Sequence, residues 1–152
     1  MSLRIKNYEL ETLAYFLYEM KLGTKKSRMR TRLLKLVESY LVDLREANVA
    51  LIQEFAIHDE NGQLIYEDEE TKSFKLDPLT SENYFKELDI LGNEEVVFEI
   101  NEATQDMILT VAQSFLEEEV KLSQNEATIY DNICEQLEDI LARYEHKEEI
   151  TN

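Results

Sequence analysis

Several pairs of glutamates have a spacing that could bind a divalent cation. Glu99 and Glu102 lie three residues apart, as do Glu135 and Glu138, so on a helix both carboxylates of a pair would share one face. All-helical nucleotide pyrophosphatases hold Mg²⁺ with such a Glu-x-x-Glu pair followed by Glu-x-x-Asp. The chain contains no Glu-x-x-Asp. We therefore expect solvated carboxylates without a metal, and a metal-dependent nucleotide hydrolase is only the remote alternative.

The remaining residues that could do chemistry are few and scattered. His58, Cys134 and His146 lie far apart, and none forms a zinc-type pair. Cys134 stands beside Ile133 and Leu137, which predicts a packing role. The 3 glycines are too few for a phosphate-binding loop. We expect no catalytic residue, no cofactor-binding residue, no metal site and no small-molecule substrate, and hence a protein that is not an enzyme.

One stretch is strongly basic. Residues 21–35, KLGTKKSRMRTRLLK, hold 7 Lys or Arg and no acid, although the whole chain has a net charge of -17. Once these 7 charges are set aside, the rest of the chain carries -24. The charge is therefore polarised along the sequence.

Helical periodicity predicts which way these cations face. At about 100° per residue, Arg28, Arg32 and Lys35 fall within roughly 60° of one another and opposite Leu33 and Val37. We expect Lys25 and Lys26 to precede them in a loop and Arg30 to flank them at the start of the helix. The candidate partner contacts are Lys25, Lys26, Arg28, Arg30, Arg32 and Lys35.

Three roles are open for this basic stretch. Its cations could neutralise acidic helices of the same chain, such as those with Glu117–Glu119 or Glu135–Glu138. They could contact an acidic surface of a partner protein or of a second copy. They could also bind phosphates weakly, but nucleic acid is disfavoured because aromatics are not interleaved and the rest of the chain is acidic. Cations near a helix N-terminus oppose the helix dipole, so local stability does not explain them.

Apolar spacing predicts a mainly helical chain. The 3 Gly and 1 Pro favour long helices over a sandwich or barrel. A seam through Leu33, Val37, Tyr40, Leu44, Ala47, Leu51 and Phe55 predicts one long helix to about Ala56. The other predicted helices span residues 8–22, 81–91, 102–122 and 123–144, the last opened by a Ser123–Glu126 capping box.

A small β-insert is predicted at about residues 62–100. The turn at Asp59–Gly62 precedes two short strands, 63–66 and 73–76, and residues 96–100 could add a third. We predict a helical bundle with one long helix and a small β-hairpin or sheet, with an α+β fold as the alternative, in a single domain over residues 1–152.

Composition and apolar patterning indicate which cellular compartment and which membrane association to expect. One cysteine excludes an internal disulfide and suits a reducing compartment. No apolar run approaches the roughly 18 residues of a membrane span, and the first residues lack the apolar core of a signal peptide. We therefore expect no membrane association.

The chain resembles a family of small uncharacterised proteins from phages and prophages of Gram-positive bacteria. The resemblance rests on Ser27–Arg32 at the start of the long helix, on Glu54–Gly62, on Glu94-Glu95 and on Tyr130–Glu135. It implies a phage origin and synthesis in the host cytoplasm, and it adds no catalytic residue.

We therefore expect a non-enzymatic phage protein that acts by protein–protein contact, as a virion or assembly component or as an accessory factor. The alternative is an acidic regulator or DNA mimic that targets host nucleic-acid enzymes, or a weak nucleic-acid binder through residues 21–35.

Overall fold

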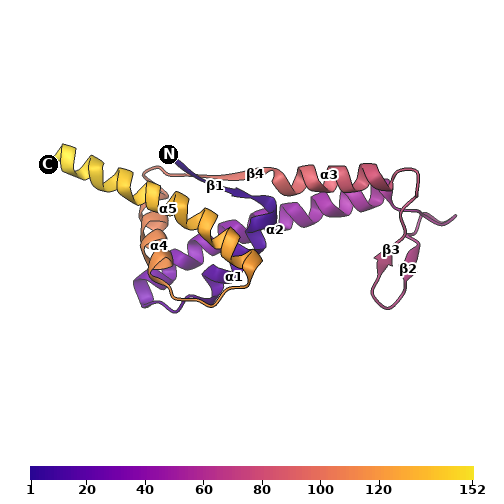
Figure 1. Cartoon of the computed structure of the whole chain (residues 1–152), viewed down its shortest axis with the longest axis horizontal. Helices are drawn as coiled ribbons and strands as arrows, with labels where there is room; N and C mark the ends of the chain where they lie inside the picture. Colours follow the sequence, from indigo (N-terminus) through magenta and orange to yellow (C-terminus); the bar gives the residue numbers. More distant parts are fainter. The chain divides into compact units, whose positions relative to one another are not determined.

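The computed structural model describes residues 1–152 and confirms a mainly α fold with small β-sheets (Figure 1). The chain divides into two compact units, one of residues 1–41 and 95–152 and one of residues 42–94. The helices are α1 (Leu10–Glu19), α2 (Thr24–Phe55), α3 (Ser81–Asn93), α4 (Gln105–Glu117) and α5 (Gln124–Thr151). The strands are β1 (Ser2–Lys6), β2 (Tyr66–Asp68), β3 (Ser73–Phe74) and β4 (Glu95–Glu99).

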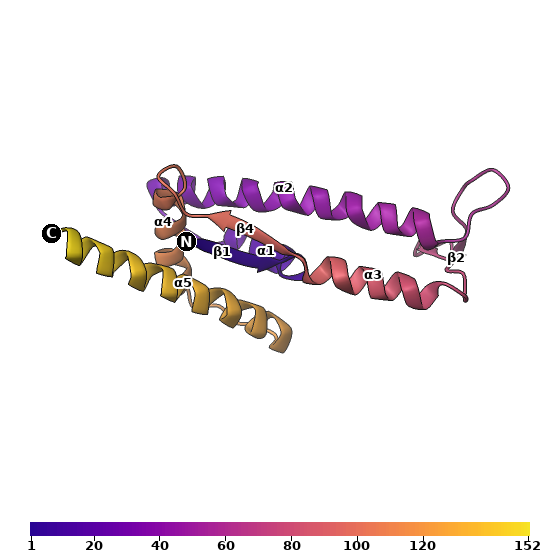
Figure 2. The same ribbon diagram turned by 90° about the horizontal axis from the view of Figure 1, so that it is seen from above.

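The first unit contains a two-stranded antiparallel sheet. Its strands lie at the starts of the two sequence segments that make up this unit. β1 pairs with β4 so that Leu3 lies opposite Phe98 and Ile5 opposite Val96. All four side chains are buried, because alternate residues of each strand face the core. The predicted third strand of the β-insert is therefore wrong in its pairing, since β4 joins the N-terminal strand and not the hairpin. Figure 2 shows the two strands side by side.

The free edge of β1 is covered by one side chain of α5. The Arg4 amide donates to Gln136 Oε1 at 2.9 Å, and Gln136 Nε2 donates to the Arg4 carbonyl at 2.7 Å. The glutamine amide thus takes the place of a further strand at this position. Such cover satisfies backbone groups that would otherwise offer an edge for strand addition.

Helices α1, α4 and α5 supply most of the core of this unit. Leu10, Leu17, Ile108, Phe115 and Ile133 are all at most 2% exposed. Apolar residues recur at helical spacing on each of the three helices, so each buries one face against the others.

Side-chain caps set where α4 and α5 begin. Asn101 Oδ1 accepts hydrogen bonds from the Ala103 and Thr104 amides, and this turn delays the regular helix until Gln105. Ser123 Oγ accepts from the Glu126 amide, as the capping box predicts, but Glu126 Oε1 accepts from the Ser123 hydroxyl and not from the Ser123 amide. The helix that follows runs to Thr151, beyond the predicted end at 144, because no Gly or Pro interrupts it.

The predicted seam of α2 is buried only over its first part. Leu33, Val37 and Leu41 are buried, and the Tyr40 ring meets Phe98 of β4 edge-on at 5.5 Å between centroids. From Leu44 onward, the seam residues are half-buried.

The second unit has a small aromatic core. The Tyr84 ring of α3 lies 6.0 Å from Phe55 and 5.6 Å from Phe74, both in edge-on geometry. α3 runs beside the end of α2 in both views (Figures 1 and 2). Strands β2 and β3 pair as the predicted hairpin, but β2 spans Tyr66–Asp68 in place of 63–66, and β3 spans Ser73–Phe74 in place of 73–76.

The Asn-Gly turn lies just before that hairpin. Asp59 Oδ1 accepts hydrogen bonds from the Asn61 and Gln63 amides, and Gly62 has φ of 78°. A positive φ favours glycine, which explains the residue at this position. The turn joins the bridged residues His58 and Leu64.

A buried carboxyl lies at the junction of β1 and α1. Glu9 is 4% exposed, and its Oε2 atom has no hydrogen-bond partner. Burial raises the pKa of Glu9, the nearby Lys6 and Tyr8 lower it, and Glu95 raises it further. The net direction is upward from 4.5, because the buried site disfavours the charged carboxylate.

Replacing Glu9 with glutamine is expected to stabilise the protein at neutral pH. Because the folded pKa is raised, the carboxyl contributes most to stability below about pH 4.5, and that contribution is lost as pH rises through the folded pKa. Glu9→Gln should raise the free energy of unfolding by about 1 kcal/mol at pH 7 and change it little at pH 4. Urea denaturation at both values measures this, with the exposed Glu99→Gln as control. A loss of stability at pH 7 would contradict the assignment.

Candidate functional site

The basic residues form a regular face at the start of α2. Lys25, Arg28, Arg32 and Lys35 follow a three-four-three spacing and occupy an arc of about 80°. All four are exposed, and we call them the basic face. The two lysines predicted in a loop are in fact in the first turn of the helix, because α2 begins at Thr24. Lys26 is also exposed but points to another side.

The cations of the basic face are not matched by acids of the same chain. The ion pairs in the structure join Arg4 to Glu95, Lys72 to Glu69 and Arg143 to Asp139. None involves the basic face or Lys26. The predicted neutralisation by acidic helices of the chain is therefore not seen in the structure. Ser27 and Thr31 lie between the cations and line with them a shallow hollow of about 250 Å³.

Arg30 differs from the other predicted contacts. Its Nη1 donates to the carbonyl oxygens of Leu17 at 2.7 Å, Tyr18 at 3.3 Å and Met20 at 2.6 Å, and Nη2 donates to Ser27 Oγ at 3.2 Å. These carbonyls end α1, where a helix lacks amide partners for its last oxygens. Arg30 thus joins the end of α1 to the start of α2. We correct its assignment from partner contact to structural cap, because its donors are already engaged within the chain.

The position of the remaining cations is unfavourable for the helix itself. α2 has no acid in its first turn, where Lys25 and Lys26 lie instead. The helix dipole favours acids there and is opposed by cations. Local helix stability therefore does not account for the basic face.

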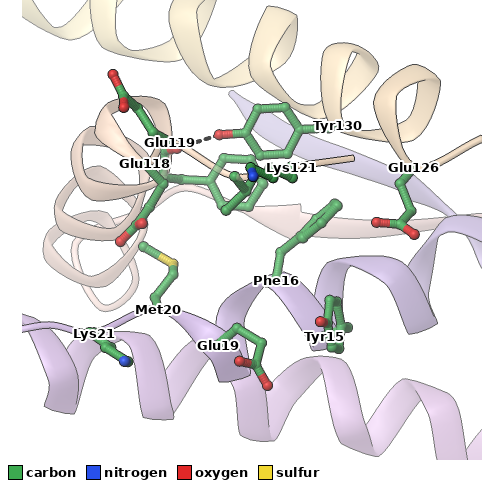
Figure 3. Close-up of a pocket in the computed structure, with 12 residues that line it drawn as sticks. Tyr15, Phe16, Glu19, Met20, Lys21, Glu118, Glu119, Lys121, Glu126 and Tyr130 are labelled. Carbon is green, nitrogen blue, oxygen red and sulfur yellow. Dashed lines mark hydrogen bonds between the residues drawn. The ribbon is translucent and has the colours of Figure 1, made fainter. Parts of the chain in front are cut away.

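The structure also shows a cavity that the sequence did not predict. It has a volume of about 450 Å³ and lies between the end of α1, the α4–α5 loop and the start of α5 (Figure 3). Phe16, Phe115 and Tyr130 form part of its wall. Phe115 and Tyr130 stack at 4.8 Å between centroids, and Phe16 meets Tyr130 edge-on at 5.2 Å. Because these residues come from three segments, no local pattern could reveal the cavity.

Tyr130 is held in place and uncharged. Its hydroxyl donates to the Phe115 carbonyl at 2.7 Å. Burial, together with Cys134 and Glu118, raises the pKa of Tyr130 to about 12. Burial also raises the pKa of the Cys134 thiol, which a hydrogen bond with Tyr130 partly offsets. The thiol form that prevails at neutral pH is a weak nucleophile.

The two glutamate pairs considered as metal ligands lie in different kinds of secondary structure. Glu99 ends β4 and Glu102 lies in the following turn, so these two do not share a helix face. Glu135 and Glu138 are exposed on α5. No group of three or more His, Cys, Asp or Glu is placed to hold a metal ion. None of the helices combines the length and apolar composition needed to cross a bilayer.

Comparison with known proteins gives one match. Neither the curated proteins nor the solved structures that were compared resemble this chain significantly. A family model described as a protein of unknown function (DUF1617) matches residues 1–143, which include the second unit, the basic face, the cavity and the first unit up to residue 143. The chain therefore belongs to this family of proteins of unknown function, DUF1617.

Proposed function

We propose that this is a phage-encoded protein of Gram-positive hosts that acts without catalysis, by binding an acidic protein surface through its basic face. That surface belongs to a partner protein or to a second copy of the chain. Synthesis takes place in the host cytoplasm, and the protein acts there as an accessory factor or within the virion. The resemblance of Ser27–Arg32 and Tyr130–Glu135 to phage proteins supports the origin.

One observation carries the binding role. Four cations share one exposed face without an ion pair, in a chain with 33 acids and a net charge of -17. Acids are abundant enough to pair with them, yet no ion pair joins any of the four to an acid of the chain. An exposed set of unpaired cations is complementary to an acidic surface of another molecule.

A protein partner fits this face better than nucleic acid. Phosphate binding gains from the number of cations engaged, and the basic face offers only four. The remaining acidic charge of the chain repels a polyanion at long range. An acidic patch on a protein covers a smaller area than a nucleic acid does. It can therefore contact the basic face without approaching the acidic remainder of the chain. The regulator or DNA-mimic alternative stays a prediction.

The salt dependence of binding tests the proposal. The tagged protein is used to isolate partners from phage-infected cells at about 0.1 M and about 0.5 M NaCl, and sedimentation at the same salt concentrations measures self-association. We expect a specific protein, or a second copy, to be retained at the lower salt and lost at the higher, because salt screens exposed charges. Retention of nucleic acid in place of protein, or a monomer without any partner at low salt, would contradict the proposal.

A further inference from the structure

The cavity beside the end of α1 is separate from the basic face and has the opposite charge. Its wall includes the rings of Phe16, Phe115 and Tyr130 and the thioether of Met20. Its volume of about 450 Å³ exceeds what a single side chain needs, and the cavity is partly open to solvent. Phe16 and Phe115 are themselves only 6% and 2% exposed, whereas Tyr15 at 56% and the half-buried Tyr130 leave aromatic surface accessible from the cavity.

Carboxylates line the same cavity. Figure 3 shows Glu19 from α1, Glu118 and Glu119 after α4, and Glu126 from the first turn of α5 around the rings. Glu126 accepts a hydrogen bond from Ser123 Oγ at 3.0 Å, whereas the other three have no ion-pair partner. Aromatic faces and free carboxylates together are the groups that bind an organic cation.

Two lysines also line the cavity and must be weighed against the acids. Lys21 and Lys121 are both exposed and form no ion pair with the glutamates. Since four carboxylates face two ammonium groups, the lining keeps a net negative charge. Tyr130 adds no charge at neutral pH, because the pKa of its hydroxyl is about 12. The electrostatic balance thus favours a cationic ligand over an anionic one.

We propose that this cavity binds an arginine side chain presented by a protein partner. The planar guanidinium stacks on an aromatic face and donates to two carboxylate oxygens at once. An ammonium group is a compact and strongly hydrated charge that lacks this geometry, so arginine is preferred over lysine. Tyr130 and Glu118, both half-buried, are the groups that meet the guanidinium, and the buried Phe16 packs edge-on against the Tyr130 ring. This site takes a basic partner segment, and it is thus distinct from the contact proposed for the basic face.

The direct test is titration of the whole protein with a small peptide, observed by NMR. The probe is acetyl-Gly-Arg-Gly-amide, with the corresponding lysine peptide and the uncharged glutamine peptide as comparisons. We expect saturable shifts of the Phe16 and Tyr130 ring signals at about millimolar arginine peptide, weaker shifts with lysine and none with glutamine. Equal shifts with all three peptides, or none with arginine, would overturn the proposal.

A matched pair of variants separates this site from the general acidity of the protein. Glu118→Gln/Glu119→Gln should weaken arginine-peptide binding about fivefold, because each exposed ion pair contributes modestly. Glu67→Gln/Glu70→Gln removes the same charge from the β2–β3 hairpin and should change arginine-peptide binding less than about twofold. Circular dichroism verifies that both variants fold. An equal loss in both variants would show attraction by net charge alone and would overturn the site.

An anion-binding site is the opposite outcome and is tested with inorganic phosphate. If Lys21 and Lys121 defined the site, phosphate would shift the same ring signals and the arginine peptide would not. We expect the reverse, and we expect Lys21→Gln/Lys121→Gln to strengthen arginine-peptide binding about twofold, since two competing cations are removed. Phosphate binding with loss of arginine binding would overturn the proposal.

Discussion

Replacing Arg30 with alanine is expected to lower the free energy of unfolding by about 2–3 kcal/mol. The guanidinium donates to three carbonyls at the end of α1 and to Ser27 Oγ, and it is half-buried. Its removal leaves the carbonyls of Leu17 and Met20 without donors at the negative end of a helix dipole. Urea denaturation followed by circular dichroism measures the change.

Arg28 supplies the matched control, because it lies on the same helix two residues away and is exposed without a partner. Arg28→Ala should change the free energy of unfolding by less than about 0.5 kcal/mol. Arg30→Lys should fall between the two, since one ammonium cannot span the carbonyls that the guanidinium bridges. Equal effects of the two alanine variants would show that the assignment of Arg30 as a cap is wrong.

Reversing two charges of the basic face should weaken partner binding and leave the free energy of unfolding almost unchanged, in contrast to Arg30→Ala. Arg28→Glu/Arg32→Glu is expected to weaken binding to the acidic partner at least about tenfold, because attractive pairs are lost and like charges now face each other. Its free energy of unfolding should stay within about 0.5 kcal/mol of the parent, since neither arginine has a partner in the chain. Titration calorimetry with the isolated partner and urea denaturation measure the two quantities.

The difference between Arg30 and its neighbours shows what periodicity can predict. The arc of Arg28, Arg32 and Lys35 follows from 100° per residue, and these residues are exposed as expected. Angular placement also puts Arg30 nearer the apolar seam. The groups to which the Arg30 side chain donates depend on the corner between α1 and α2, where the chain turns through Gly23. That corner is a tertiary feature, so its hydrogen bonds could not be predicted from spacing.

Long-range pairing explains the main differences in the fold. Capping signals at Ser123 and the Asn-Gly turn act over a few residues, and the structure contains both. The sheet joins Ile5 to Val96, and its strands are five residues each. Two alternating buried residues per strand give a weak local signal, so the sequence indicates only that residues 96–100 could add a third strand to the nearby hairpin. Long strands with a tight turn would have been easier to pair.

The two candidate sites were accessible to sequence reasoning to different degrees. The basic face lies on one helix, so spacing predicted the exposed arc of Arg28, Arg32 and Lys35, whereas Lys25 was expected in the preceding loop. The cavity draws Phe16, Phe115 and Tyr130 from three helices that meet only in the folded chain. On the sequence, each of these residues fits a core position. Only their arrangement around a space of about 450 Å³ distinguishes them.

The most direct test of the central claim compares partner retention by two variants with the same charge change. Arg28→Glu/Arg32→Glu alters the basic face, and Arg45→Glu/Lys86→Glu alters exposed cations elsewhere that form no ion pair. Quantitative affinity purification from infected cells measures the partner bound to each. Contact through the basic face predicts that the first variant loses the partner at least about tenfold while the second retains it. Equal retention by both variants would contradict the claim.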